Sequence, residues 1–248
     1  MREVVLKYLK NNLTLIASND FTKLYKEGEA FVESNEITDV LLQSDINPLP
    51  HMTRIPSYYA GTLKNLTTVN IPKNIEKIGD SAFWNCENLE TVHIAEGLRL
   101  IGESAFSECH NLKHIDLPES LDRIQADAFG DCGLTSIVIP SMVTRIPMMC
   151  FQDCKDLKTV TLGTNTTEVS SRAFDGCSSL STIDLKNVEV IKSNAFSDCP
   201  NLKFIELPDT IHTLDPQAFN DAVVTLICSR DSYSHRFAIR NQIRFRFK

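Results

Sequence analysis

The sequence lacks the features expected of a membrane-spanning or exported protein. No apolar run among its 248 residues approaches the roughly 18 residues that a bilayer-spanning helix needs. The first apolar stretch, residues 4–16, is interrupted by Lys7, Lys10, Asn11 and Asn12, and no small-residue cleavage site follows it. We therefore expect a cytoplasmic protein without membrane contacts, which would be secreted only if a signal had been removed.

The short motifs of common enzyme classes are missing as well. The sequence contains no G-x-S-x-G or H-E-x-x-H motif, no phosphate-binding loop and no dinucleotide-binding fingerprint. We therefore predict a protein that is not an enzyme and that holds no cofactor.

Basic residues are fewer than acidic ones, and the formal net charge is −7. This balance disfavours nucleic acid as a partner. Residues 229–248 are the exception, with a net charge of +5 that leaves −12 on the remainder. They hold one acid, Asp231, and six bases: Arg230, Arg236, Arg240, Arg244, Arg246 and Lys248. The cluster is either a solvated helix face or a site for an acidic partner.

What the sequence does contain is a repeat with a period of 22 or 23 residues. Its marker is Ala-Phe-x-x-Cys, in which Cys150 replaces the Ala of one unit and Ala222 replaces the Cys of the last. The seven Phe positions are Phe83, Phe106, Phe129, Phe151, Phe174, Phe196 and Phe219. A fixed period of this length is typical of a solenoid, in which successive coils stack.

Each unit also carries apolar residues with the spacing of short strands. One example is Leu112-x-x-Ile115-x-Leu117, followed by the pair Leu121 and Ile124. One unit is too small to bury these side chains alone, so we predict parallel coils that bury them in columns about 4.8 Å apart. The 22-residue units lose one residue each in connecting segments, residues 132–134 and 185–191. Phe106 and Phe129 should be fully buried.

Cysteine is unusually regular for a chain that we expect in the cytoplasm. The eight residues are Cys86, Cys109, Cys132, Cys150, Cys154, Cys177, Cys199 and Cys228. Six follow the repeated Phe by three residues, which predicts a buried column of reduced thiols. Disulfides and a metal site are the alternatives. Parallel Cβ directions in neighbouring coils disfavour the first, and the absence of C-x-x-C spacing disfavours the second.

The full unit, as in residues 101–118, resembles the BspA-type leucine-rich repeat. The resemblance covers roughly residues 53–248, and residues 224–228, 232–233 and 241–243 resemble the closing strand, helix and strand of that family. It implies a right-handed, curved α/β solenoid of short parallel strands and short helical turns that binds proteins. Family members on bacterial and protozoan surfaces are adhesins, so a surface adhesin is an alternative function.

A second resemblance lies at the junction formed by residues 39–56, which is similar to repeat proteins of tailed bacteriophages. It implies a phage-encoded protein that acts on a host protein in the host cytoplasm. A self-associating structural scaffold, a homo-oligomer that assembles through the solenoid ends, is a further alternative.

Residues 1–50 lack the repeat and show patterns that favour helices. The first helix would carry one apolar face: Val4, Val5, Tyr8 and Leu9. Residues 18–20 offer an N-cap for a second helix, and residues 36–45 are compatible with a third. We therefore predict a helical N-terminal cap over residues 1–50, a solenoid of about seven to eight coils over residues 51–222, and a C-terminal cap over residues 223–248.

The strand residues that alternate with the buried ones should form two exposed columns. The first column is Thr68, Thr91, His114, Ser136, Thr159, Thr182 and Phe204; the second is Asn70, His93, Asp116, Val138, Thr161, Asp184 and Glu206. We predict that a protein partner binds this surface, with more contact at the C-terminal half, where Phe204 is apolar beside acids. The candidate contact residues are Thr91, His93, His114, Asp116, Val138, Thr159, Thr161, Thr182, Asp184, Phe204 and Glu206.

Three other features have a functional and a structural interpretation. His93, His114 and Asp116 could orient an imidazole or hold a metal weakly, but a solvated surface row is the favoured interpretation because nothing completes the site. In five units an acid directly precedes the Cys or the Ala that replaces it, and we interpret this column as solubilising charge: Glu108, Asp131, Asp153, Asp198 and Asp221. Trp84 should point outward as a contact residue, or pack beneath a neighbouring coil.

Overall fold

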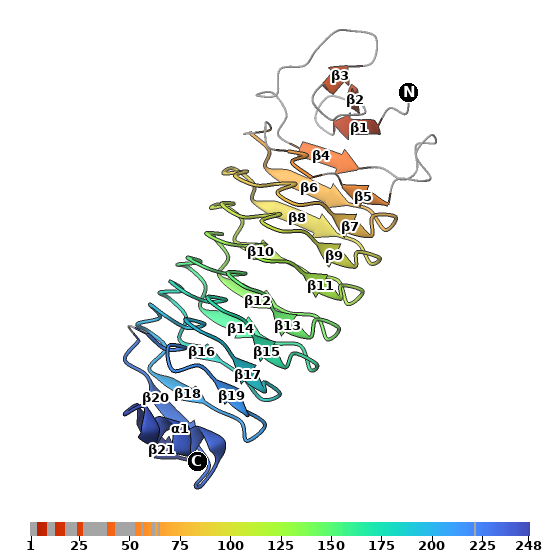
Figure 1. Ribbon diagram of the computed structural model, residues 1–248. Helices are drawn as coiled ribbons and strands as arrows, with labels where there is room; N and C mark the ends of the chain where they lie inside the picture. The colour runs from red at the N-terminus through yellow and green to blue at the C-terminus, as the bar shows by residue number, and fades with distance from the viewer. Residues whose placement is uncertain are drawn as a thin grey trace.

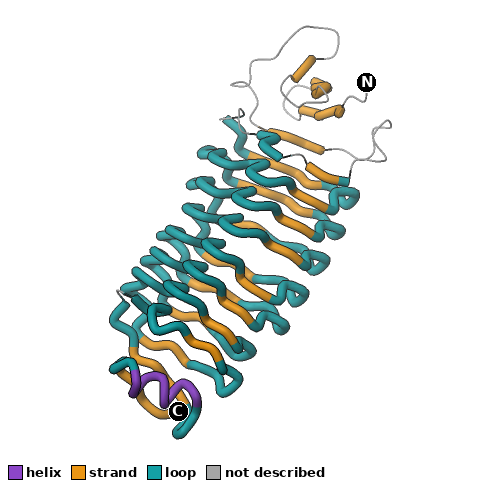
Figure 2. The backbone as a smooth tube through the Cα atoms, in the orientation of Figure 1, coloured by secondary structure: helices purple, strands orange, loops and turns teal. Residues whose placement is uncertain are grey.

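The computed structural model describes residues 4–8, 13–17, 24–26, 39–42, 53–55, 57–60, 63, 65–220 and 222–248. Residues 53–248 of this set form one elongated solenoid, in which the chain winds through about eight stacked turns (Figures 1 and 2). Each coil contributes a first strand, a short second strand and a segment of tight turns. The predicted parallel solenoid is therefore confirmed.

The first strand of each coil contains the Ile or Val of the Leu-x-x-Ile-x-Leu pattern. These strands pair in parallel with no shift in register, as Ile137 with Val160 and Val160 with Ile183. They are β6 (Thr68–Ile71), β8 (Thr91–Ile94), β10 (His114–Ile115), β12 (Ser136–Val138), β14 (Thr159–Thr161), β16 (Thr182–Ile183), β18 (Phe204–Glu206) and β20 (Thr225–Cys228).

The second strands are only two residues long and end on the next buried apolar residue. They too pair in parallel, as Ile101 of one coil with Ile124 of the next. They are β5 (Arg54–Ile55), β7 (Lys77–Ile78), β9 (Leu100–Ile101), β11 (Arg123–Ile124), β13 (Arg145–Ile146), β15 (Glu168–Val169), β17 (Val190–Ile191) and β19 (Thr213–Leu214).

The row of first strands is interrupted between β16 and β18, and both rows are interrupted at one level, between β10 and β12 and between β11 and β13. This is the coil that is shortened at residues 132–134, a connecting segment as predicted. Gly133 is required there, because a Cβ on it would lie 1.9 Å from the carbonyl oxygen of His110. The Gly133 N–H donates to the Cys109 carbonyl oxygen at 3.1 Å, so the shortened coil still stacks on the preceding one.

The Ala-Phe-x-x-Cys segments are tight turns with left-handed residues on both sides of the Phe. Around Phe83, the backbone φ is 52° at Ser81 and 55° at Asn85. Each turn is closed by a hydrogen bond from residue i to residue i−3, such as the Cys86 N–H to the Phe83 carbonyl at 3.3 Å. The predicted single turn is present, and the left-handed residues keep it from extending into an α-helix.

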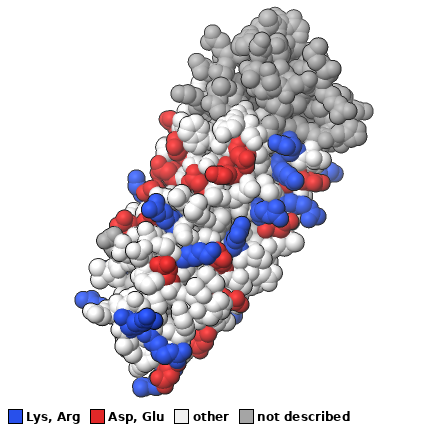
Figure 3. Space-filling model, in the orientation of Figure 1, with Lys and Arg blue, Asp and Glu red and all other residues white. Residues whose placement is uncertain are grey.

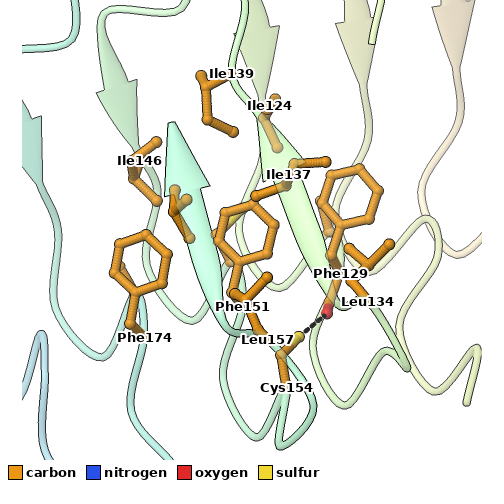
Figure 4. Close-up of a cluster of buried hydrophobic side chains, with 14 of the residues drawn as sticks. Ile124, Phe129, Leu134, Ile137, Ile139, Ile146, Phe151, Cys154, Leu157 and Phe174 are labelled. Carbon is orange, nitrogen blue, oxygen red and sulfur yellow. Dashed lines mark hydrogen bonds between the residues drawn. The ribbon is translucent and has the colours of Figure 1, made fainter. Parts of the chain in front are cut away.

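The core is a stack of phenylalanine rings running the length of the solenoid. Adjacent rings from Phe83 to Phe219 are nearly parallel, with centroids 5.2–5.9 Å apart. Six of the seven are wholly buried, and Phe219 is 6% exposed. Leucine and isoleucine side chains of the same coils surround these rings (Figure 4). The predicted burial of Phe106 and Phe129 is confirmed.

All eight cysteines are free and buried, which confirms the column of buried thiols predicted from the repeat. The thiols of the main column donate to the backbone of the preceding coil, which their apolar alternatives could not do. The Cys154 Sγ lies 3.0 Å from the Phe129 carbonyl oxygen (Figure 4), and the Cys132 Sγ lies 2.9 Å from that of Phe106. Burial raises the pKa of these two thiols well above their ordinary range. Each thiol therefore both fills the core and satisfies a buried carbonyl.

One position that departs from the apolar repeat pattern is also explained by a hydrogen bond to the preceding coil. Thr166 occupies a slot that is apolar in the other coils, yet it is only 1% exposed. Its Oγ1 donates to the Val143 carbonyl oxygen of the preceding coil at 2.7 Å. A buried hydroxyl is tolerated here because it has a hydrogen-bond partner.

The described residues of the N-terminal segment are strands, so the prediction of helices is wrong for them. β1 (Val4–Tyr8) pairs antiparallel with β2 (Leu13–Ala17), which pairs with β3 (Leu24–Lys26). β4 (Asp39–Leu42), within the third expected helix, pairs in parallel with β6. The rest of the predicted N-terminal cap lies outside the described residues, and the domain bounds remain predictions.

The C-terminal residues form a strand, a helix and a strand. After β20, helix α1 (Tyr233–Arg240) is capped by Ser232, whose Oγ accepts from the His235 N–H at 3.1 Å. The chain then returns as β21 (Arg244–Phe247), which pairs in parallel with β20. The row of first strands therefore continues to the last residues of the chain.

Candidate functional site

The exposed side chains of the first strands and β21 form a continuous surface, which we call the strand face. Its two columns follow the strand register, as Thr159 beside Thr182 and Val138 beside Thr161. All eleven candidate contact residues lie on this face, and only Thr91 among them is half-buried rather than exposed. Whether they bind a partner remains a prediction.

The structure brings four of these candidates together at the C-terminal end of the strand face. Thr182, Asp184, Phe204 and Glu206 line an open groove of about 620 Å³. The other lining residues are Ile183, Leu185, Lys186, Pro208, Ile227 and Lys248. The remaining candidates lie further toward the N-terminus, on β8, β10, β12 and β14, except Asp116, which directly follows β10.

One side chain of the groove lining is an aromatic ring that a cation covers on one side. Phe204 remains 51% exposed, and the guanidinium carbon of Arg246 lies 4.6 Å from its ring centroid. Next to this pair, the Lys248 Nζ lies 3.3 Å from Glu206 Oε1. The predicted residues Phe204 and Glu206 are thus each paired with a basic residue, Arg246 of β21 and Lys248 directly after it.

Sequence reasoning missed Arg246 and Lys248 as members of this face. The cluster of bases is visible in the sequence, but its place on the strand face depends on how the last strand pairs. The usable signal is the alternation Arg244-Phe245-Arg246-Phe247-Lys248, which has the period of a strand. Parallel pairing of Ile227 with Arg246 then places these bases at the end of the strand-face columns.

Of the predicted group His93, His114 and Asp116, only His114 and Asp116 form a contacting pair. His114 Nε2 lies 2.9 Å from Asp116 Oδ1, and both side chains are exposed. His93 lies on the adjacent strand, where its neighbour Val92 is in register with Ile115. Among the described residues, no group of three metal-ligating side chains comes together.

The acidic column on the turns has a backbone explanation. Glu108, Asp131, Asp153 and Asp198 all have positive φ, between 49° and 62°. Asp and Asn tolerate this left-handed conformation better than most residues, and Gly176 fills the same slot in another coil. Asp221, the fifth member, lies outside the described residues. The turn geometry therefore accounts for these positions, and the solubilising role of the acids remains a prediction.

Two further observations concern the surface. Trp84 is 42% exposed, so its ring is only partly available to a partner. No helix in the described part of the chain is long and apolar enough to cross a bilayer.

Known structures show the same architecture. A leucine-rich repeat protein from Bacteroides ovatus is 26% identical, with a TM-score of 0.72 over 91% of this chain and 60% of its own. A Treponema pallidum leucine-rich repeat protein is 26% identical, with a TM-score of 0.65 over 79% of this chain and 90% of its own. A leucine-rich cell surface protein from Faecalibacterium prausnitzii has 22% identity and a TM-score of 0.55, covering 88% of this chain and 75% of its own.

This chain thus spans 60% of the length of the Bacteroides ovatus protein. A search among curated proteins found no match. The model of the BspA-type leucine-rich repeat region matches residues 27–158 and 122–232, with six copies of the repeat. The chain therefore belongs to the BspA-type leucine-rich repeat family.

Proposed function

We propose that this protein binds a partner protein through its strand face, without catalysis, and that the C-terminal groove is the centre of the contact. Leucine-rich repeat proteins are in general protein-interaction or surface modules. The observation that carries the proposal for this chain is Phe204, an aromatic ring 51% exposed within a groove of about 620 Å³.

The chemistry around the ring supports a binding hot spot. Aromatic and arginine side chains dominate the energy of protein interfaces when a partner removes them from water. Phe204 and Arg246 already lie against each other, so less side-chain entropy is lost when a partner covers them. Val138, 62% exposed on the same face, adds an apolar contact nearer the middle of the solenoid.

A pull-down with matched variants tests the proposal. We expect Phe204→Ala to weaken capture of the partner by about 2 kcal/mol or more, the usual hot-spot threshold. Asp153→Asn, on a turn, keeps a residue that tolerates positive φ and should leave capture unchanged. Val138→Arg places a charge on the strand face and should also reduce capture. If all three variants retain the same partner as the wild type, the strand face is not the binding surface.

We further propose that the protein acts in the cytoplasm. Eight free, buried cysteines support a reducing compartment, since exported proteins of this cysteine content commonly form disulfides. Fractionation of the native cells, with detection by antibody, tests this. Finding the protein outside the cell would favour the adhesin alternative.

A further inference from the structure

The last strand presents basic side chains at alternate positions on the strand face. Arg244, Arg246 and Lys248 are all exposed, and they alternate with Phe245 and Phe247. Register places Arg244 beside Thr225 and Arg246 beside Ile227. Lys and Arg side chains lie over the C-terminal end of the solenoid, beside some Asp and Glu side chains (Figure 3). This end is basic on a chain whose net charge is −7.

The Arg246 guanidinium lies over the Phe204 ring and can still bind a carboxylate. Its guanidinium carbon lies 4.6 Å from the Phe204 ring centroid, so the ring supports the guanidinium. A guanidinium above an aromatic ring keeps N–H groups at its edge, and these match the two oxygens of a carboxylate. Within the described residues, no carboxylate lies within 4.0 Å of Arg244 or Arg246, whereas Lys248 is already paired with Glu206.

We propose that this end of the strand face binds an extended acidic segment of a partner protein, with carboxylates at alternate positions. Arg244 and Arg246 are two residues apart on one strand, so their Cα atoms are about 6.6 Å apart. An extended peptide repeats its side chains on one side at the same interval, so two of its carboxylates reach both guanidinium groups at once. The proposal rests on the proposed function and names the chemistry of the partner.

The neighbouring residues limit how far the acidic segment extends. Toward β16, the groove is lined by Asp184 and Glu206, which repel further carboxylates, and by the exposed face of Phe204. Lys186, also in the lining, accepts at most an isolated acid there. The fitting segment is therefore acidic over β21 and apolar over Phe204.

Fluorescence anisotropy with the full chain tests the proposal. The probe is a labelled ten-residue peptide in which Glu and Val alternate, and its control is an isomer that groups the same Glu residues together. We expect the alternating peptide to bind about ten-fold more tightly than the isomer, and salt to weaken it. Arg246→Ala and Arg244→Ala should each weaken binding by about ten-fold.

Control variants separate recognition from general charge and from folding. Arg240→Ala, on the exposed last turn of α1, removes the same charge away from the strand face and should leave binding within about two-fold of the wild type. Arg246→Lys keeps the charge but loses the planar fork, so it should bind more weakly than the wild type. The urea midpoint of Arg246→Lys shows whether its fold is intact. If Arg246→Ala does not fold, the peptide affinity of Arg246→Lys decides whether Arg246 takes part in binding.

Three results would overturn the proposal: equal affinity for both peptides, an Arg246→Lys affinity equal to that of the wild type, or tighter binding of a single-stranded oligonucleotide than of the alternating peptide. A failure here is distinguishable from a failure of the proposed function. If Val138→Arg abolishes partner capture while Arg246→Ala does not, the strand face binds a partner of other chemistry. If peptide binding requires both Arg244 and Arg246 while partner capture is unchanged by the strand-face substitutions, the proposed function fails.

Discussion

Replacing one ring of the phenylalanine stack is the sharpest test of how the solenoid is held together. Phe129 is wholly buried, and its ring lies 5.6 Å from those of Phe106 and Phe151, with interplanar angles of 4° and 5°. Phe129→Ala removes the ring from between two coils. Because each coil of a solenoid contacts only its neighbours, no other side chain is positioned to fill the space.

The expected magnitude follows from this packing. Replacement of a buried Phe by Ala costs roughly 3–5 kcal/mol, which combines lost transfer energy with the cavity left behind. Each aromatic pair contributes about 0.5–1.5 kcal/mol beyond its buried area. Since Phe129 takes part in two such pairs, we expect a loss of about 4–5 kcal/mol in the free energy of unfolding. Phe219 stacks on Phe196 alone among the described rings, so Phe219→Ala should cost less.

Urea unfolding followed by circular dichroism measures these differences. Phe204→Ala is the matched control, because it deletes the same ring from an exposed position, and it should change the free energy of unfolding by about 1 kcal/mol or less. The reasoning is refuted if Phe129→Ala costs under about 1 kcal/mol, the range of surface substitutions. It is also refuted if Phe219→Ala costs more than Phe129→Ala.

The remaining predictions concern the thiols and the shortened coil. In the folded chain the eight buried thiols should be silent to a thiol reagent, and denaturation should release all eight; fewer than about six would indicate disulfides. Burial raises the pKa of Cys199 from 9.0 to about 12, so the folded state keeps a proton that the unfolded state loses. The free energy of unfolding should therefore fall as the pH rises from 9 toward 12, and urea midpoints that stay constant over this range would contradict it. Gly133→Ala should destabilise the fold by at least about 1 kcal/mol, because the added Cβ would lie 1.9 Å from the His110 carbonyl oxygen. Gly163→Ala should act similarly, because its Cβ would lie 2.3 Å from the Pro140 carbonyl oxygen. Thermal melts measure both effects.

The solenoid could be predicted from the sequence because each repeat unit places the same residue types at the same spacing. The constant spacing of the Phe residues aligns the repeat units with one another. A substitution in one unit, such as Cys150 for Ala or Thr166 for an apolar residue, therefore does not obscure that alignment. The structure explains these exceptions afterwards: both side chains are buried, and the Thr166 hydroxyl donates to the Val143 carbonyl. Redundant patterns of this kind leave little freedom for an alternative fold.

The N-terminal segment offered no such redundancy. Val4, Val5 and Tyr8 fit a helix face, yet Val4–Tyr8 is strand β1. A short apolar run cannot be assigned to a helix or a strand by periodicity alone, and β-branched residues favour the strand. What decides it is the antiparallel pairing of β1 with β2, a tertiary contact that the segment itself does not encode.

The candidate site was predictable in part, for the same reason. Alternation along the strands identified the exposed positions, including Phe204 and Glu206. It did not identify their partners, because Arg246 and Lys248 reach them only after the chain turns through α1 and returns as β21. That return depends on tertiary packing. The resemblance to phage proteins, likewise carried by a single junction, remains a prediction.

Positions that recur in every coil and positions that change from coil to coil carry different information. The acids of the turns recur because a left-handed backbone favours Asp, Asn or Gly, as Asp153 and Gly176 show in adjacent coils. Their charge therefore says little about a partner. On the strand face the backbone accepts most side chains, yet the columns change from Thr to His, Val, Phe and Arg along the solenoid. Because the fold does not require these changes, specificity for a partner is most reasonably sought there, at the end where Phe204 and Arg246 meet.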